Sequence, residues 1–201
     1  MTELKILQAV RLKGRVSRDD LAATVDDTPD AVAAAVTAAI ESGLLIEGKT
    51  LRLSEEGRSR LTQLLATERG TADTAAIARA YESFRPVNAD FKALISDWQI
   101  KDGAPNPHDD PAYDAAVLAR LDDVHQRVTP MIAAVAAQIP RLGHYSVKLQ
   151  SALDKVHAGE TSWLTRPIID SYHTVWFELH EELILAAGLT REQEARAGHA
   201  N

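Results

Sequence analysis

The segment LLIEGKTLRL, residues 44–53, predicts two short strands around a turn at Gly48 and Lys49. The segments on both sides have helical patterns, because apolar residues recur at intervals of three and four over residues 3–13 and 29–42. The same periodicity returns along most of the remaining chain of 201 residues. We therefore predict a mainly α fold in which a small β-hairpin interrupts a series of helices.

Polar caps predict where the helices around this hairpin begin. Ser17, with an acidic residue three positions on, has a capping-box pattern at the start of a short second helix. Thr28 is the expected N-cap of a third helix, and Pro29 is its expected first residue. Ser54 caps a fourth helix. Residues 1–67 are therefore predicted to form one domain of four helices and a hairpin.

This arrangement resembles the winged helix-turn-helix domains of MarR-type and PadR-type regulators. The matching segments are residues 17–21, residues 28–29, the SGLL run at 42–45, and the LRLSEEGR run at 51–58, which fits the "L-T/S-x-x-G" exit from a wing. The resemblance implies a winged helix over residues 1–67, with the hairpin as its wing and the third helix in the recognition position. It covers the first third of the chain.

The chemistry of the third helix does not favour reading of DNA sequence. Base edges in the major groove are read chiefly by Arg, Lys, Asn and Gln. Residues 29–42 contain none of these, and their polar positions are Asp30, Thr37, Glu41 and Ser42. Basic residues nearby could instead contact phosphates, or could form a solvated face that balances neighbouring acidic residues. The candidates for contact with a DNA backbone are Arg11, Lys13, Arg15, Arg18, Lys49 and Arg52.

The charge of the chain limits where nucleic acid could bind. The net charge is −7, of which residues 1–67 contribute −1 and residues 68–201 contribute −6. An acidic surface repels phosphate at long range, so any contact needs a local basic patch. Residues 68–201 offer no such patch.

Several classes of protein are not expected. No stretch approaches the roughly 18 apolar residues of a membrane span, and Glu3 and Lys5 interrupt the start where a signal peptide would be apolar. Cysteine is absent, which excludes disulfides and thiol chemistry. We predict a cytoplasmic protein that has no membrane partner, no cofactor and no bound metal.

Residues 68–74 are the expected hinge, and residues 75–197 are expected to form a helical bundle that ends in a tail at 198–201. Pro86 predicts a kink or a break in the first helix of the bundle, and Pro130 predicts an interruption of a later helix. The proline-rich segment 101–112 is expected to be a loop.

The segment at residues 161–188 is apolar on most sides and is predicted to be the central helix. A further helix is expected over residues 143–157, and a last short helix near Thr190 and Gln193. The apolar surface of the central helix exceeds what a bundle of this size needs. We therefore expect a homodimer through the C-terminal helices.

Polar and aromatic residues are interleaved on helices of the predicted bundle, and this pattern has two readings. Arginine beside tryptophan can form a small-molecule pocket, and it can equally form a buried ion pair that joins two helices. The candidate residues for a ligand pocket are Arg85, Asn88, Asp97, Trp98, Arg166, Asp170, His173 and Trp176.

Asp170, His173 and His180 share one helical face, and side chains of these types can bind a metal ion. The two histidines are seven residues apart, or about 10 Å along a helix axis at 1.5 Å per residue. That separation is too long for one small ion without further ligands, so no metal is predicted.

The chain also resembles a tail segment of actinobacterial phosphoenolpyruvate-utilising proteins that are similar to pyruvate phosphate dikinase. The matching stretches are residues 10–15, Asp97-Trp98 and residues 165–183. No ATP-grasp segment, phosphohistidine motif, G-x-S-x-G elbow or H-E-x-x-H motif accompanies them. We therefore predict a protein that is not an enzyme. It is expected to be a transcription-regulator-like protein, or alternatively a protein-interaction or accessory module whose winged helix does not bind DNA.

Overall fold

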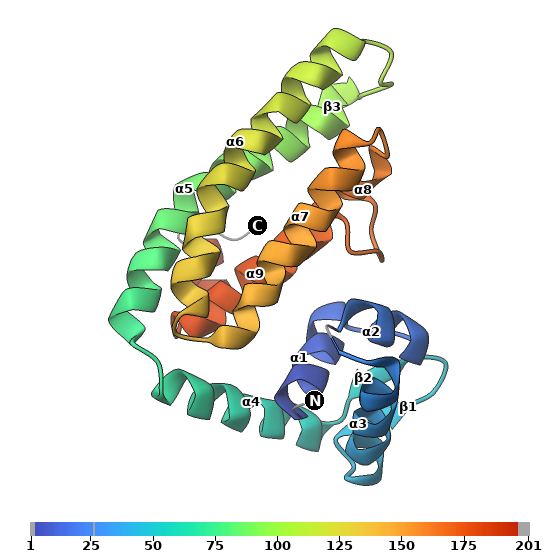
Figure 1. Cartoon of the computed structure of the whole chain (residues 1–201), viewed down its shortest axis with the longest axis vertical. Coiled ribbons are helices and arrows are strands. Elements are labelled where there is room, and N and C mark those ends of the chain that lie inside the picture. Colours follow the sequence, from blue (N-terminus) through green and yellow to red (C-terminus); the bar gives the residue numbers. More distant parts are fainter. Residues whose placement is uncertain (1–2, 26, 197–201) are drawn as a thin grey trace. The chain divides into compact units, whose positions relative to one another are not determined.

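The computed structural model describes residues 3–25 and 27–196 and divides the chain into two compact units (Figure 1). The first unit is Met1–Ala72 and the second is Asp73–Asn201. The division falls within the segment 68–74 that was expected to be a hinge. The predicted tail at 198–201 lies outside the described residues.

The first unit contains four helices and one antiparallel pair of strands. In chain order they are α1 (Glu3–Lys13), α2 (Arg18–Thr24), α3 (Pro29–Glu41), β1 (Leu45–Glu47), β2 (Leu51–Leu53) and α4 (Glu55–Gly70).

The predicted N-caps of the first unit are confirmed. The hydroxyl groups of Ser17, Thr28 and Ser54 accept hydrogen bonds from backbone amides in the first turns of α2, α3 and α4. Each cap satisfies a donor that a helix end would otherwise leave without a partner. Local side-chain chemistry therefore determines where these helices begin.

One core holds the elements of the first unit together. Ile6, Leu7, Leu21 and Leu51 lie within it and are almost fully buried. Val16 forms an antiparallel bridge with Leu51, so the chain before α2 pairs with the hairpin. The hairpin is thereby attached to the helices by backbone hydrogen bonds as well as by apolar contact.

The second unit is almost entirely helical. In chain order its elements are α5 (Thr74–Gln99), β3 (Ile100–Lys101), β4 (Ala104–Pro105), α6 (Pro111–Ala136), the 3-10 turn η1 (Pro140–Gly143), α7 (His144–His157), α8 (Ser162–Thr165), α9 (Tyr172–Ala186) and α10 (Arg191–Arg196). The long helices α5 and α6 lie side by side, and α7 lies along α9 (Figure 1).

The predicted interruption at Pro130 is wrong, because α6 continues through it. At Pro86, where a kink or a break was expected, α5 has no break. A proline inside a helix costs about 3 kcal/mol, because it removes one backbone hydrogen bond and its ring crowds the preceding turn. Both prolines lie on exposed faces, and each 26-residue helix buries a long apolar stripe. Packing along that stripe outweighs the local cost.

The single central helix predicted for residues 161–188 is also wrong, because the segment contains α8, a connecting loop and α9. Pro167 disfavours continuation of α8, and Ser171 is the N-cap of α9. Ile168, which falls within the predicted central helix, is 83% exposed in the loop and has a positive φ. The predicted loop at 101–112 is correct only in part, because it includes the end of β3, all of β4 and the first two residues of α6.

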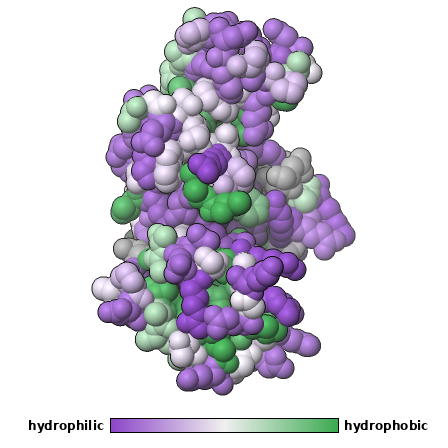
Figure 2. Space-filling model, turned by 90° about the vertical axis from the view of Figure 1, so that its right-hand side faces the viewer, coloured by the Kyte–Doolittle hydropathy of each residue, from purple (hydrophilic) through white to green (hydrophobic). Residues whose placement is uncertain are grey.

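Large apolar side chains at the surface are few and are spread over different elements. Figure 2 shows one face of the molecule, on which hydrophobic residues form small patches among hydrophilic ones. Among the described residues, no helix combines the length and the hydropathy that crossing a bilayer requires. The exposed large apolar residues are Ile46, Ile100, Val147, Ile168 and Phe177.

Candidate functional site

The solvent-facing side of α3 consists mainly of small residues. Val32, Val36 and Ala39 face the core, and the opposite side carries no basic or amide side chain. An acidic residue lies near each end of this exposed side. Its residues are Pro29, Asp30, Ala33, Ala34, Thr37, Ala38 and Glu41.

Arg18, a predicted backbone-contact residue, is held within the first unit. Its Nη2 donates to Glu47 Oε2 at 2.9 Å, and its Nε donates to Glu47 Oε1. Its Nη1 lies 3.4 Å from Thr37 Oγ1 on α3. These hydrogen bonds hold the pKa of the Glu47 carboxyl below its ordinary value. A phosphate would have to displace Glu47 to reach Arg18, although this pair is exposed and therefore weak.

The remaining predicted cations of the first unit differ in exposure. Arg11 and Lys13 are half-buried on α1 and make contacts there. Arg15, Lys49 and Arg52 are exposed. The structure therefore leaves the last three best placed to reach a partner.

The hairpin brings two of these exposed cations together. Val16 and Leu51 pair in an antiparallel bridge, so the flanking residues Arg15 and Arg52 occupy adjacent positions on neighbouring chain segments. Like charges at such positions repel and lower stability, unless an anion lies between them. Lys49 lies in the turn of the same hairpin. These three residues, Arg15, Lys49 and Arg52, are called the wing cations below.

In the second unit, two of the predicted pocket residues meet in the core. Trp176 Nε1 on α9 donates to Asn88 Oδ1 on α5 at 2.9 Å, and both side chains are buried. The rings of Phe84 and Phe91 lie 5.2 and 4.4 Å from the Trp176 ring. This hydrogen bond satisfies the indole N–H inside an aromatic layer, which is a structural role.

Arg85, Asp97 and Trp98 all belong to α5 but have different partners. Arg85 pairs with Glu194 of α10, as described below. The Asp97 carboxylate accepts from Arg120 at 2.5 Å on an exposed surface. The Trp98 ring lies 4.4 Å from the His108 ring.

The other three predicted pocket residues lie at or near the loop between α8 and α9. Asp170 pairs with Lys148 of α7 at 2.9 Å. His173 is exposed, with its ring 6.0 Å from that of Phe91, and Arg166 is exposed at the end of α8. Asn88 and Trp176 thus contact each other, whereas Arg85, Asp97, Trp98, Asp170 and His173 contact residues outside the predicted set.

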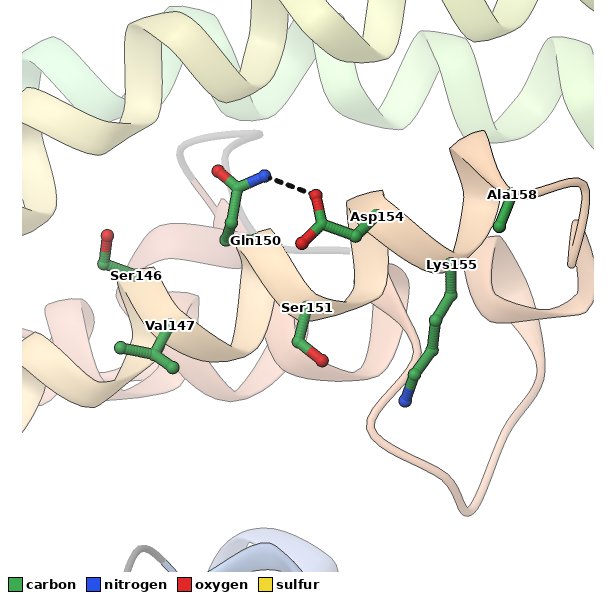
Figure 3. Close-up of a pocket in the computed structure, with 7 residues that line it drawn as sticks. All are labelled: Ser146, Val147, Gln150, Ser151, Asp154, Lys155 and Ala158. Atoms are coloured by element: carbon green, nitrogen blue, oxygen red, sulfur yellow. Dashed lines mark hydrogen bonds between the residues drawn. The ribbon is translucent and has the colours of Figure 1, made fainter.

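A pocket of about 590 Å³ lies along the outer side of α7, and none of the eight residues lines it (Figure 3). Gln150 donates to Asp154 there at 2.8 Å, and Lys155 Nζ lies 3.4 Å from the centre of the Trp163 ring. The polar side chains of Gln150, Asp154 and Lys155 therefore already contact residues of this unit. The lining residues are Ser146, Val147, Gln150, Ser151, Asp154, Lys155 and Ala158.

A chain of hydrogen bonds leads from this pocket into the core. Gln150 Oε1 lies 3.0 Å from His125 Nε2, and His125 Nδ1 lies 3.2 Å from the Tyr172 hydroxyl. Burial lowers the pKa of His125, which favours the neutral ring. The amide oxygen can only accept, so Nε2 carries the proton and Nδ1 accepts from Tyr172.

α9 was predicted to be apolar on most sides, but it buries three carboxylates and an imidazole. They belong to Glu178, His180, Glu181 and Glu182, each 9% exposed or less. Glu178 and Glu182 are four residues apart and so share one face. Acidic residues at that spacing within an apolar run are the signal in the sequence that could have indicated buried ion pairs.

One buried ion pair, in which an arginine contacts both oxygens of a carboxylate, joins α9 to η1. Arg141 donates through Nη1 and Nη2 to the two carboxylate oxygens of Glu182, at 2.6 and 2.9 Å. The Glu182 side chain is 1% exposed. Burial, together with the charges of Glu182 and Glu178, raises the pKa of the nearby Tyr145.

His180 is buried in its neutral form. Burial lowers its pKa from 6.5 to about 4, and its Nε2 lies 3.2 Å from the Tyr81 hydroxyl. Between these two pKa values the unfolded chain binds more protons than the folded chain, so stability falls as the pH falls. The charged groups that act on the ring are Glu181, Arg191, Glu194 and Lys92.

We predict that His180→Gln makes the second unit less sensitive to acid. The difference in free energy of unfolding, variant minus wild type, should increase by about 2 kcal/mol as the pH is lowered from about 7 to about 5, at 1.36 kcal/mol per pKa unit. All three tryptophans lie in the second unit, so urea unfolding followed by Trp emission measures this quantity. Parallel pH curves for the variant and wild type would contradict the prediction.

Comparisons of the chain with protein-family models, with curated proteins and with solved structures found no match. Among the described residues, no group of three His, Asp or Glu side chains is arranged to hold a metal ion.

Proposed function

We propose that the protein is a non-catalytic regulatory protein whose first unit is a winged helix that contacts the DNA backbone. The order α1, α2, α3, β1, β2, α4 is the order that this resemblance implies. The observation that carries the proposal is the pairing of Val16 with Leu51, which gathers the exposed Arg15 and Arg52 beside the wing. Phosphate contact would offset the repulsion between these two arginines.

Recognition of a particular DNA sequence is not part of this proposal. The exposed side of α3 offers no side chain that pairs with base edges, and Arg18 is engaged by Glu47. Contacts to phosphate position a protein on DNA without reading the sequence. We therefore expect unrelated DNA fragments to bind with similar affinity.

Substituting the two adjacent wing cations tests the proposal. In fluorescence anisotropy with unrelated duplexes, Arg15→Ala/Arg52→Ala should weaken binding at low salt. Each lost phosphate contact should reduce the slope of log K against log salt by about 0.9, or about 1.8 for the pair.

Arg60→Ala is the matched control, because Arg60 is an exposed arginine of the same unit that pairs with Glu3 at 2.7 Å. This variant should keep the wild-type slope. Absence of binding by the wild-type protein at low salt would overturn the DNA proposal.

A second candidate function is a protein-interaction or accessory module, and the exposed side of α3 favours it. Ala33, Ala34 and Ala38 would let another chain approach this helix closely, between the acidic ends at Asp30 and Glu41. The resemblance to a tail segment of phosphoenolpyruvate-utilising proteins points in the same direction. Lack of DNA binding would leave this candidate standing.

Dimerisation through the C-terminal helices stays a prediction, but the apolar surface on which it was based is mostly covered within the single chain. Eleven of the fifteen residues of α9 are buried within the single chain, so no second copy is needed to cover this helix. Phe177 is its one exposed large apolar side chain. We propose that the second unit senses a ligand or a partner.

A further inference from the structure

α10 has one buried side chain, and that side chain is the carboxylate of Glu194. Glu194 is 2% exposed, while Glu192, Gln193 and Ala195 are exposed. A helix of six residues is not stable by itself in water, so its position depends on its contacts. Because α10 buries no apolar side chain, polar contacts are what hold it.

Two side chains of α5 donate hydrogen bonds to this carboxylate. The Tyr81 hydroxyl donates to Glu194 Oε2 at 2.6 Å, and Arg85 Nη2 donates to Glu194 Oε1 at 2.8 Å. Tyr81 and Arg85 are four residues apart and therefore lie on one face of α5. The Arg85 guanidinium also lies 5.0 Å from the centre of the Tyr81 ring, which fixes the two donors relative to each other.

His180 of α9 orients the tyrosine. The Tyr81 hydroxyl has one proton and donates it to Glu194, so the contact with His180 requires a proton on Nε2 of the imidazole, which donates to the hydroxyl oxygen. The Phe84 ring packs 5.3 Å from the His180 ring and restricts its rotation. The hydroxyl is thereby aimed at the carboxylate.

This geometry is specific for a carboxylate. Each of the two oxygens of the Glu194 carboxylate has its own donor, and one of the two donors is cationic. Water is largely excluded from this place. Burying a carboxylate without such partners is costly, whereas charge-assisted hydrogen bonds of this kind are strong. A neutral or apolar group in the same place would leave Arg85 without its buried anion.

The second attachment of α10 is weaker. Arg191 pairs with Glu181 and lies 4.9 Å from the centre of the Phe177 ring, but its side chain is 41% exposed. The Glu181 side chain is 11% exposed, but the arginine end of the pair lies in water, which screens this attachment more than the contacts of Glu194. The docking of α10 therefore depends chiefly on Glu194.

We propose that Tyr81, Arg85 and His180 form a carboxylate-binding site that the chain's own Glu194 occupies, so that α10 is a latch which a competing carboxylate ligand releases. Release would uncover the site and free the C-terminal segment of the chain. The proposal does not depend on DNA binding by the first unit.

The latch is tested with the substitution Glu194→Gln in the full chain. This variant keeps the shape of the side chain and removes its charge, so α10 should leave its site more often. Trypsin cleavage after Arg191, followed by mass spectrometry, should become at least about tenfold faster, because cleavage requires the open segment. Glu82→Gln is the matched control, since Glu82 pairs with the same Arg85 but its side chain is 64% exposed, and this change leaves the sequence around the cleaved bond intact. It should keep the wild-type rate. An unchanged rate in Glu194→Gln would overturn the proposal.

The binding site is tested with Glu194→Ala and sodium acetate as the probe. Acetate should raise the thermal midpoint of the Trp-emission transition in a saturable way, and sodium chloride at equal ionic strength should not. The effect should disappear in Glu194→Ala/Arg85→Met. Equal responses to acetate and chloride in Glu194→Ala would show that the site does not select carboxylates and would overturn that part of the proposal.

Discussion

Gly57→Ala is expected to unfold the first unit while the second unit stays folded. A Cβ atom at position 57 would lie 2.0 Å from the Leu44 carbonyl oxygen and 2.9 Å from its carbonyl carbon. Both are backbone atoms, so no side-chain rotation can relieve the contact. Overpacking of this kind costs 1–3 kcal/mol in ordinary cores, and we expect about 3 kcal/mol or more here.

The surroundings of Leu44 explain why it cannot move aside. The Ser54 amide donates to the Leu44 carbonyl at 3.1 Å, and the Ser54 hydroxyl donates to the Gly43 carbonyl at 2.7 Å. The Gly57 amide in turn donates to the same Ser54 oxygen at 2.8 Å. A shift of Leu44 would therefore disrupt the cap of α4 and the start of the hairpin together.

The measurement uses the uneven distribution of aromatic residues. Residues 1–72 contain no Trp, Tyr or Phe, so Trp emission reports the second unit alone, and hydrogen exchange of amides in α1 to α4 reports the first. Gly57→Ala should remove protection in α1 to α4 and leave the emission transition in place.

Gly70→Ala is the control for this prediction. Gly70 ends the same helix, and a Cβ atom there would meet nothing within 4 Å. This change should be neutral or stabilise by up to about 1 kcal/mol. If the two alanine variants have similar protection, the close contact with Leu44 is not what requires glycine at position 57.

The first unit could be predicted closely because its signals are local. Ser17, Thr28 and Ser54 cap helices through amides three residues away, and Gly14 and Gly43 end helices with the positive φ that glycine adopts readily. Such contacts are visible in the sequence because both partners are near each other in the chain.

The second unit was harder to predict because distant contacts decide its structure. Pro86 and Pro130 are local signals for a break, yet packing between α5 and α6 keeps both helices continuous. Pro167 and Ser171 are local signals for the break before α9, but the apolar pattern that surrounds them predicts a continuous helix.

The candidate sites show the same division. The sequence identifies Arg15, Lys49 and Arg52 as cations near a hairpin, and the structure adds that Arg15 and Arg52 are adjacent. The sequence could not indicate that Arg85 pairs with Glu194, because 109 residues separate the two. Residue type predicts what chemistry a side chain can supply, whereas its partner depends on tertiary packing.

Arg141→Met is expected to destabilise the second unit by about 3–5 kcal/mol, because it leaves the Glu182 carboxylate buried without its bidentate partner. Methionine keeps most of the length of the side chain, so loss of the charge and its hydrogen bonds dominates over loss of packing. Urea unfolding followed by Trp emission should show the midpoint moving to lower urea with little change in slope.

Two further variants separate the buried charge from the substitution itself. Arg127→Met removes an arginine whose partners, Asp90 and Asp123, are more than half exposed, and it should cost less than about 1 kcal/mol. In Arg141→Met/Glu182→Leu no charge of the pair stays buried, so most of the lost stability should return. The second substitution removes the unpaired carboxylate and leaves the introduced methionine in place. If the double variant is as unstable as Arg141→Met, the cost arises from packing around η1 and not from the unpaired Glu182.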